Sequence, residues 1–412
     1  MYKRKVLSQG VRLVAEEIPT VSSVAVGFWV NVGSRWEMPA EAGLSHLLEH
    51  LLFKGTTKRS ARAIAEALDS VGGQLNAFTT KEYTCYYAKV LSEHVPLALD
   101  VLSDMLLDPL LTAEDIEREK QVVLEEIRMY EDSPDELVHD LLTGVAWPDH
   151  PLGRPTLGTE ETLSSLTPDH IRAFHERHYT PDNLVITVAG NLEYEKVREL
   201  LERQLQGRQA TAPQHCQPAP VFSPGLQIFE RDTEQVHVCL GAKGIPVEDD
   251  TNYVVDVLNS ILGGGLSSRL FQHIREEKGL AYSVYSYHTA YQGAGLFTVY
   301  LGLSEEKLQE GLSLVRAEMA NLGKEEVSTA ELERAKQQVL GGFLLGLENT
   351  TNRMIRLGKQ ELSLGRYVSP QEVKQKIGEV TAAAVREVCA KVFRPEQLTT
   401  VVLGPKVCGE LE

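Results

Sequence analysis

The 412-residue chain carries one sequence pattern twice, and this duplication limits the possible folds more than any other feature. Residues 166–190 and 380–404 each combine a helical pattern, a proline turn and an apolar strand. Four residues of the first stretch recur 214 positions later in the second: Thr167 as Thr381, Pro181 as Pro395, Leu184 as Leu398 and Gly190 as Gly404. A second pair, residues 117–126 and 333–342, repeats at an offset of 216. Offsets this similar, in the same order along the chain, predict two copies of one structural unit.

Each copy is expected to be an α+β unit. In the first copy, apolar alternation predicts strands at residues 24–32 and 84–90, and helical periodicity predicts helices at 61–71 and 112–131. Strands clustered beside helices are typical of a mainly antiparallel sheet covered by helices, here expected on one face.

A stretch rich in proline and glycine, residues 207–226, is predicted to link the copies. The predicted domains are therefore an N-terminal domain, residues 1–206, and a C-terminal domain, residues 227–412. Two domains suit the length, because a single hydrophobic core stops growing beyond about 250–300 residues.

Charge and cysteine content exclude several classes of protein. The net charge of −17 would be repelled by phosphates, so no nucleic-acid partner is expected. No run of 18 consecutive apolar residues is present, and no apolar run follows the basic N-terminal residues, so neither a membrane span nor an export signal is predicted. The five cysteines are scattered without a CxxC pair, which favours reduced thiols and a cytoplasmic location.

The main chemical motif is His46-Leu-Leu-Glu49-His50. On a helix, positions i, i+3 and i+4 share one face, so both imidazoles can bind one metal ion while Glu49 reaches the same place. Two neutral imidazoles suit Zn²⁺, and a nearby carboxylate can take a proton from water. The alternative is an amphipathic helix with two hydrogen-bonded histidines.

A catalytic zinc site needs a third protein ligand, and the predicted helix at residues 112–131 is the best source. Glu119 and Glu126 are seven positions apart and share a face of that helix, about 10 Å from each other along its axis. At this separation one carboxylate would be the ligand and the other would act from outside the ligand shell. The spacing does not distinguish them, and a solvated helix face is the alternative.

His46-x-x-Glu49-His50, followed 76 positions later by Glu126, resembles the inverted-motif zinc peptidases, which include pitrilysin, insulin-degrading enzyme and the mitochondrial processing peptidase. The resemblance covers nearly the whole chain and is closest to the short bacterial processing-peptidase-like members. It implies that His46, His50 and Glu126 ligate zinc, that Glu49 is the general base, and that Glu119 supports the site from outside the ligand shell.

The second copy lacks this ligand set. At offsets of 210 and 216 the five corresponding positions are Asp256, Asn259, Ser260, Ala335 and Gly342. One Zn²⁺ per chain is therefore expected.

Two further segments match the family. The resemblance implies that Arg275 and Tyr282 of the second copy act at the zinc site, where a phenol can stabilise the oxyanion formed on a peptide carbonyl. Without it, a surface ion pair and a strand aromatic are the simpler interpretations. It also implies that Asn76, Ala77 and Phe78 belong to an edge strand that binds an extended peptide; the alternative is a plain hairpin.

The resemblance therefore implies a zinc metalloendopeptidase that hydrolyses peptides or flexible presequence-like segments inside a closed chamber, with Glu49 activating zinc-bound water. Family chambers contain four such domains and this chain supplies two, so a homodimer is expected. The alternative is a scaffold or peptide-binding subunit of the same fold that is non-catalytic or depends on a partner.

Overall fold

The computed structural model describes residues 1–208 and 218–405, which form two compact units. Unit 1 comprises Met1–Arg128, Arg154–Gln217 and Leu345–Tyr367, and unit 2 comprises Met129–Gly153, Pro218–Leu344 and Val368–Glu412. Each unit thus contains one segment from the opposite half of the sequence. The predicted domain boundaries at residues 206 and 227 do not account for these two segments. Part of the predicted linker, residues 209–217, lies outside the described residues.

Unit 1 is built on a six-stranded sheet that is antiparallel except between β2 and β6. Its strands, in spatial order, are β1 (Tyr2–Val6), β2 (Arg12–Glu17), β6 (Leu184–Gly190), β3 (Ser23–Val30), β5 (Thr84–Leu91) and β4 (Gln74–Thr79). The strands predicted at 24–32 and 84–90 are therefore confirmed within two residues at each end. β4 forms one edge of the sheet.

Helices cover both faces of this sheet, so the expectation of a single covered face is wrong. Val26 and Phe28 of β3 face the main core, whereas Ala25 and Trp29 face a second cluster on the other side. The unit's helices are α1 (Leu44–Leu51), α2 (Ala61–Asp69), α3 (Val95–Leu107), α4 (Ala113–Glu131), α6 (Glu160–Ser165), α7 (Pro168–His178), α8 (Tyr194–Gln204) and α12 (Thr350–Ser363). The helices predicted at 61–71 and 112–131 correspond to α2 and α4.

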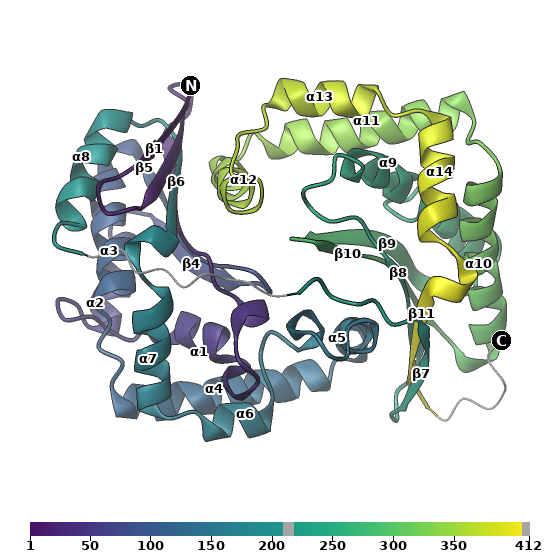
Figure 1. The fold of residues 1–412 in the computed structure, drawn as a ribbon, viewed down its shortest axis with the longest axis horizontal. Coiled ribbons are helices and arrows are strands. Elements are labelled where there is room, and N and C mark those ends of the chain that lie inside the picture. Colours follow the sequence, from purple (N-terminus) through teal and green to yellow (C-terminus); the bar gives the residue numbers. More distant parts are fainter. Residues whose placement is uncertain (209–217, 406–412) are drawn as a thin grey trace. The chain divides into compact units, whose positions relative to one another are not determined.

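The second face of the sheet is covered by α12, which comes from the C-terminal half of the sequence and packs on β6, β3 and β2 (Figure 1). Gly358 lets this helix approach closely, because a Cβ added there would lie 2.1 Å from Trp29 Cε2. Glu361, which is buried, accepts two hydrogen bonds of 2.8 Å from the Arg4 guanidinium. A helix that looks like part of the second copy in the sequence therefore completes the core of the first.

Unit 2 repeats this architecture with a five-stranded sheet that is antiparallel except between β7 and β11. Its strands, in spatial order, are β7 (Gly225–Glu230), β11 (Leu398–Gly404), β8 (Val236–Lys243), β10 (Ala294–Leu303) and β9 (Ala281–Tyr291). Its helices are α5 (Pro134–Ala146), α9 (Asn252–Leu262), α10 (Leu308–Lys324), α11 (Thr329–Gly346), α13 (Pro370–Gly378) and α14 (Ala382–Val392).

α5 comes from the N-terminal half of the sequence and packs on β8 and β11 of unit 2. Its residues Val138 and Leu142 share a core cluster with Cys239 and Val401. The two copies have thus exchanged one helix each. The α+β class and the mainly antiparallel sheets agree with the sequence prediction, whereas the exchange was not predicted.

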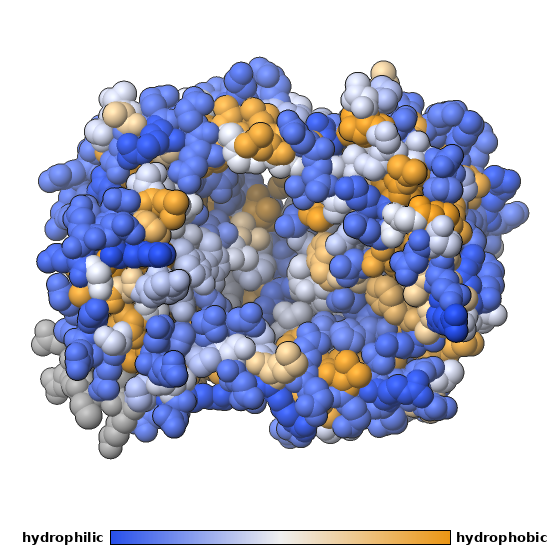
Figure 2. All heavy atoms as spheres, turned by 180° about the vertical axis from the view of Figure 1, so that it is seen from behind, coloured by the Kyte–Doolittle hydropathy of each residue, from blue (hydrophilic) through white to orange (hydrophobic). Residues whose placement is uncertain are grey.

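Within the described residues, no helix is both long and apolar enough to cross a lipid bilayer. On the face drawn in Figure 2, hydrophilic residues predominate and hydrophobic ones form small separate groups.

Candidate metal centre

The motif His46-Leu-Leu-Glu49-His50 lies on α1, as predicted, and the start of this helix is fixed by a carboxylate. Glu37 accepts hydrogen bonds from the backbone N–H groups of Gly43 (2.9 Å) and Ser45 (2.7 Å), which a helix start otherwise leaves unpaired. Gly43 has a φ of +91°, which favours glycine. Glu37 therefore sets where the turn that carries His46 begins.

The second helix of the site, α4, is held at two points. Thr112 Oγ1 accepts a 3.1 Å hydrogen bond from the backbone N–H of Asp115, which caps the start of the helix. Lys120 is buried and its Nζ donates to the backbone oxygen of Leu166 (2.9 Å). These contacts orient the face of α4 that carries Glu119 and Glu126.

His46, His50 and Glu126 converge, with their ligand atoms all within 4.8 Å of one another. Glu126 Oε1 lies 3.7 Å from His46 Nε2, and Glu126 Oε2 lies 3.6 Å from His50 Nε2. The Glu126 side chain is 44% exposed and the His46 side chain 11%, so the group opens to solvent on the Glu126 side.

The spacing of these three residues suits a shared zinc ion better than direct hydrogen bonds among them. The nitrogen–oxygen separations exceed hydrogen-bond length, but ligands about 2.1 Å from a tetrahedral zinc lie about 3.4 Å apart. Neither ring nitrogen of His46 makes a hydrogen bond within the described part of the chain, and its Nδ1 is buried. The Nε2 of His46, which faces Glu126 and makes no such bond, is therefore available to bind an ion.

Electrostatics also favour metal binding. Burial, and next the neighbouring His50, lower the pKa of His46 to about 4. The imidazole is therefore neutral at pH 7, which is the form that donates its lone pair to a metal ion.

Glu119 and Lys54 extend the site beyond the three converging residues. Glu119 is buried, with Oε2 3.5 Å from His50 Nδ1 and Oε1 2.8 Å from Lys54 Nζ. A carboxylate behind a ligating histidine orients the ring and raises its basicity. The structure thus places the two glutamates of α4 differently: Glu126 faces both Nε2 atoms, and Glu119 lies behind one ring.

Glu49 shares the ligand face of α1 and hydrogen-bonds to the edge strand. Its Oε2 accepts a 2.5 Å hydrogen bond from Thr79 Oγ1, while its Oε1 makes no hydrogen bond within the described residues. Burial raises the pKa of Glu49, an effect that Thr79 and His50 oppose and Glu126 reinforces.

The predicted peptide-binding segment lies on β4, and the edge position expected for it is observed. Successive side chains of the strand alternate between the faces of the sheet: Ala77 packs on the main core, whereas Phe78 packs near Trp29 on the α12 face. The exposed Asn76 accepts a hydrogen bond from the backbone of Ala77. Binding of a peptide by these three residues stays a prediction.

Arg275 and Tyr282 lie together in unit 2. The Arg275 guanidinium carbon is 5.0 Å from the centre of the Tyr282 ring, and Tyr282 is 76% exposed at the start of β9. The pair is therefore accessible to a ligand. Its action at the metal centre stays a prediction.

The described residues contain one group of histidine, cysteine and acidic side chains close enough to hold a metal ion, and it is the group in unit 1. In unit 2, Ser260 donates to Gln338 Oε1 (3.1 Å) and Ser286 donates to Asn259 Oδ1 (2.7 Å). At the two positions aligned with His50 and Glu49, neutral hydrogen bonds thus replace the histidine and carboxylate chemistry of unit 1.

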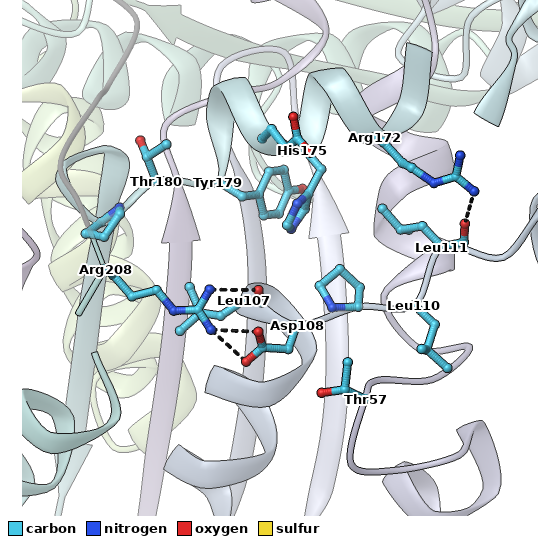
Figure 3. Close-up of a pocket in the computed structure, with 13 residues that line it drawn as sticks. Thr57, Leu107, Asp108, Leu110, Leu111, Arg172, His175, Tyr179, Thr180 and Arg208 are labelled. Atoms are coloured by element: carbon cyan, nitrogen blue, oxygen red, sulfur yellow. Dashed lines mark hydrogen bonds and ion pairs between the residues drawn. The ribbon is translucent and has the colours of Figure 1, made fainter. Parts of the chain in front are cut away.

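A separate cavity of about 460 Å³ in unit 1 is shown in Figure 3, lined by residues that precede α4 and by the end of α7. Three of its charged groups pair with protein atoms: Arg208 with both oxygens of Asp108 (2.7 Å each), and Arg172 with the backbone oxygen of Leu111 (3.1 Å). None of the predicted site residues lines it. The cavity therefore does not compete with the metal centre as the candidate catalytic site.

Sequence reasoning missed Glu37, Lys54 and Thr79. Lys54, four residues after His50, carried a usable signal, since i,i+4 spacing places it on the motif face of the helical turn. Glu37 and Thr79 gave no signal, because each reaches α1 from a separate segment.

Comparisons with known proteins find peptidase family models and relatives named zinc proteases. A model described as insulinase (peptidase family M16) matches residues 12–160, and one described as the peptidase M16 inactive domain matches residues 165–339. The chain is 44% identical over 402 residues to a Bacillus subtilis protein named uncharacterized zinc protease YmxG, with 98% of each chain covered. It is also 44% identical over 413 residues to the uncharacterized zinc protease SCO5738 of Streptomyces coelicolor, covering 98% of this chain and 89% of the relative.

Solved structures share the fold. A protease from Helicobacter pylori superposes with a TM-score of 0.91 at 24% identity, covering 98% of this chain and 99% of the other. A peptidase M16 inactive domain from Pseudomonas fluorescens gives 0.92 at 22% identity, with 99% of each chain covered.

Proposed function

Since the chain belongs to peptidase family M16, the insulinase family, we propose that it is a zinc-dependent endopeptidase acting on extended peptides or flexible presequence-like segments. The prediction of a peptidase from the sequence is confirmed at the level of the family. The observation that carries the proposal is the convergence of His46, His50 and Glu126, whose ligand atoms all lie within 4.8 Å of one another at separations longer than hydrogen bonds. The presence of this ligand set disfavours a non-catalytic scaffold.

In this proposal the Nε2 atoms of His46 and His50 and a carboxylate oxygen of Glu126 hold one Zn²⁺ per chain. Zinc bound there supplies Lewis acidity, which polarises the scissile carbonyl and makes water a better nucleophile at neutral pH. Glu119 keeps the His50 ring oriented, and Lys54 balances the buried charge of Glu119.

Glu49 moves the proton. As the oxygen of water forms a bond to the scissile carbon, an O–H bond breaks and its proton passes to Glu49 Oε1. The same proton then passes to the amine nitrogen as the C–N bond breaks, and Glu49 returns to its ionised form. Burial of Glu49, which raises its pKa, helps the carboxyl hold the proton between the two steps.

Binding of substrate is assigned to the free edge of β4, where Asn76, Ala77 and Phe78 offer backbone groups to an extended peptide. Tyr282 would donate to the oxyanion and Arg275 would hold a substrate carbonyl. The exposure of Tyr282 supports this assignment.

Removal of metal is expected to abolish hydrolysis of an unstructured, internally quenched peptide, because the three ligands then hold no Lewis acid. Elemental analysis should find about one zinc per chain before chelation. Adding back Zn²⁺ should restore the rate, whereas Mg²⁺, which prefers six oxygen ligands, should not. Unchanged peptide hydrolysis by the metal-free protein would contradict the proposed function.

We also propose that two copies assemble into a closed chamber, since family chambers contain four such domains. Light scattering on the purified chain should then give twice the monomer mass of 45.7 kDa. Peptide hydrolysis per chain should fall on dilution below the dissociation constant of the dimer. A monomer with full activity at every concentration would contradict the dimer and leave the zinc site untouched.

A cytoplasmic location stays part of the proposal. Cys85, Cys239 and Cys389 are buried free thiols, as expected in a reducing compartment.

A further inference from the structure

We infer that Thr79 is a positioning residue for Glu49: its hydroxyl fixes one carboxylate oxygen so that the other faces the metal centre. This inference rests on the proposed function and deepens it. It starts from the 2.5 Å contact between Thr79 Oγ1 and Glu49 Oε2, which joins the last residue of β4 to the last turn of α1.

The direction of this hydrogen bond follows from the neighbouring groups. Thr84, which pairs with Thr79 across the two strands, donates its own hydroxyl proton to the backbone oxygen of Val32 (3.0 Å). Thr79 can then give its single proton either to Thr84 Oγ1 at 3.4 Å or to Glu49 Oε2 at 2.5 Å. The proton goes to the nearer, charged carboxylate of Glu49, because hydrogen bonds to ionised acceptors are shorter and about twice as strong as those to neutral ones.

Fixing one oxygen matters because a glutamate side chain is flexible. Holding it in a single conformation costs rotamer entropy, and the hydrogen bond from Thr79 offsets this cost before substrate binds. Since Oε2 is occupied, Oε1 is the oxygen left to take the proton from water. A catalytic base must lie within hydrogen-bond reach of its proton, so the orientation of this carboxylate affects the rate directly.

The location of Thr79 gives the contact a second effect. Leu75 and Ala77 pack on the same core as α1, and Thr79 continues this alternation toward Glu49. The strand whose free edge is proposed to bind the peptide therefore also anchors the base. A peptide paired with β4 and the carboxylate that activates water are positioned by the same strand.

The test compares Thr79→Val, which keeps the shape and removes the donor, with Thr79→Ser, which keeps the donor. Thr79→Val is expected to lower kcat roughly 10- to 100-fold with KM within about twofold, because the lost contact acts on the base and not on substrate binding. Thr79→Ser should restore kcat to within about threefold of wild type. Zinc content and the thermal unfolding midpoint should match wild type in both variants.

Two further measurements separate positioning from general structure. In a Glu49→Gln background, Thr79→Val should cause no additional loss, because two residues that act through one carboxylate are not additive. Should Thr79→Val fail to fold, Thr79→Ala removes the same donor and is read the same way.

Wild-type kcat in Thr79→Val, an effect confined to KM, or failure of serine to rescue would overturn the inference and leave the peptidase proposal standing. A wild-type protein that hydrolyses no peptide would instead refute the proposed function itself.

Discussion

Glu49→Gln is expected to lower kcat for peptide hydrolysis roughly 10²- to 10⁴-fold, the usual contribution of a general acid–base residue. The amide cannot take the proton from water, but it keeps the size of the side chain and can still accept the hydrogen bond from Thr79. Because Glu49 is not among the three converging ligands, zinc content should stay at about one ion per chain. Elemental analysis beside single-turnover kinetics would measure both.

A matched control is Glu114→Gln on α4, whose side chain is 83% exposed and pairs only with Arg118 among the described residues. Its kcat should stay within about twofold of wild type, since exposed ion pairs contribute little. If Glu49→Gln behaved like this control, Glu49 would not be the base. If it instead lost its zinc, the carboxylate would have to be counted among the ligands.

The largest effect on stability is expected from Gly358→Ala on α12. The added Cβ would lie 2.1 Å from Trp29 Cε2 and 2.5 Å from Trp29 Nε1, far inside van der Waals contact. Trp29 is fully buried, and its Nε1 donates to Thr187 Oγ1 (2.8 Å), so the ring cannot move aside without losing that bond. The free energy of unfolding should fall by about 3 kcal/mol, as overpacking a tight core does. Urea denaturation followed by tryptophan fluorescence would measure it.

Gly342→Ala on α11 is the matched control, because a Cβ added there meets nothing within 4 Å. Alanine is the better helix former, so this variant should be unchanged or more stable by up to about 1 kcal/mol. Equal unfolding midpoints for the two variants would show that α12 does not pack tightly on the sheet in solution.

Local patterns in the sequence predicted much of the fold and the centre of the site. The repeat at 214 positions identified two α+β copies, and the spacing within α1 placed His46, Glu49 and His50 on one face. These features depend on residues close in the chain, where helix and strand periods apply directly.

Contacts between distant segments could not be predicted. Periodicity shows that α12 has an apolar face, but not which sheet receives it, and the close approach at Gly358 depends on Trp29, far earlier in the chain. The roles of Glu37 and Thr79 could not be predicted for the same reason, because each contacts α1 from another segment. The chemistry of Glu119 and Glu126 was also left open by sequence spacing, because only the packing of α4 decides which carboxylate faces both imidazoles.

The exchange of α5 and α12 has a consequence for how the protein is made. During synthesis the first sheet can form once β6 has left the ribosome. The face of that sheet that carries Trp29 stays uncovered until α12 emerges, about 160 residues later. A nascent chain halted between these points would carry an apolar surface with no cover. Neither half of the gene alone therefore encodes all the helices that cover its own sheet.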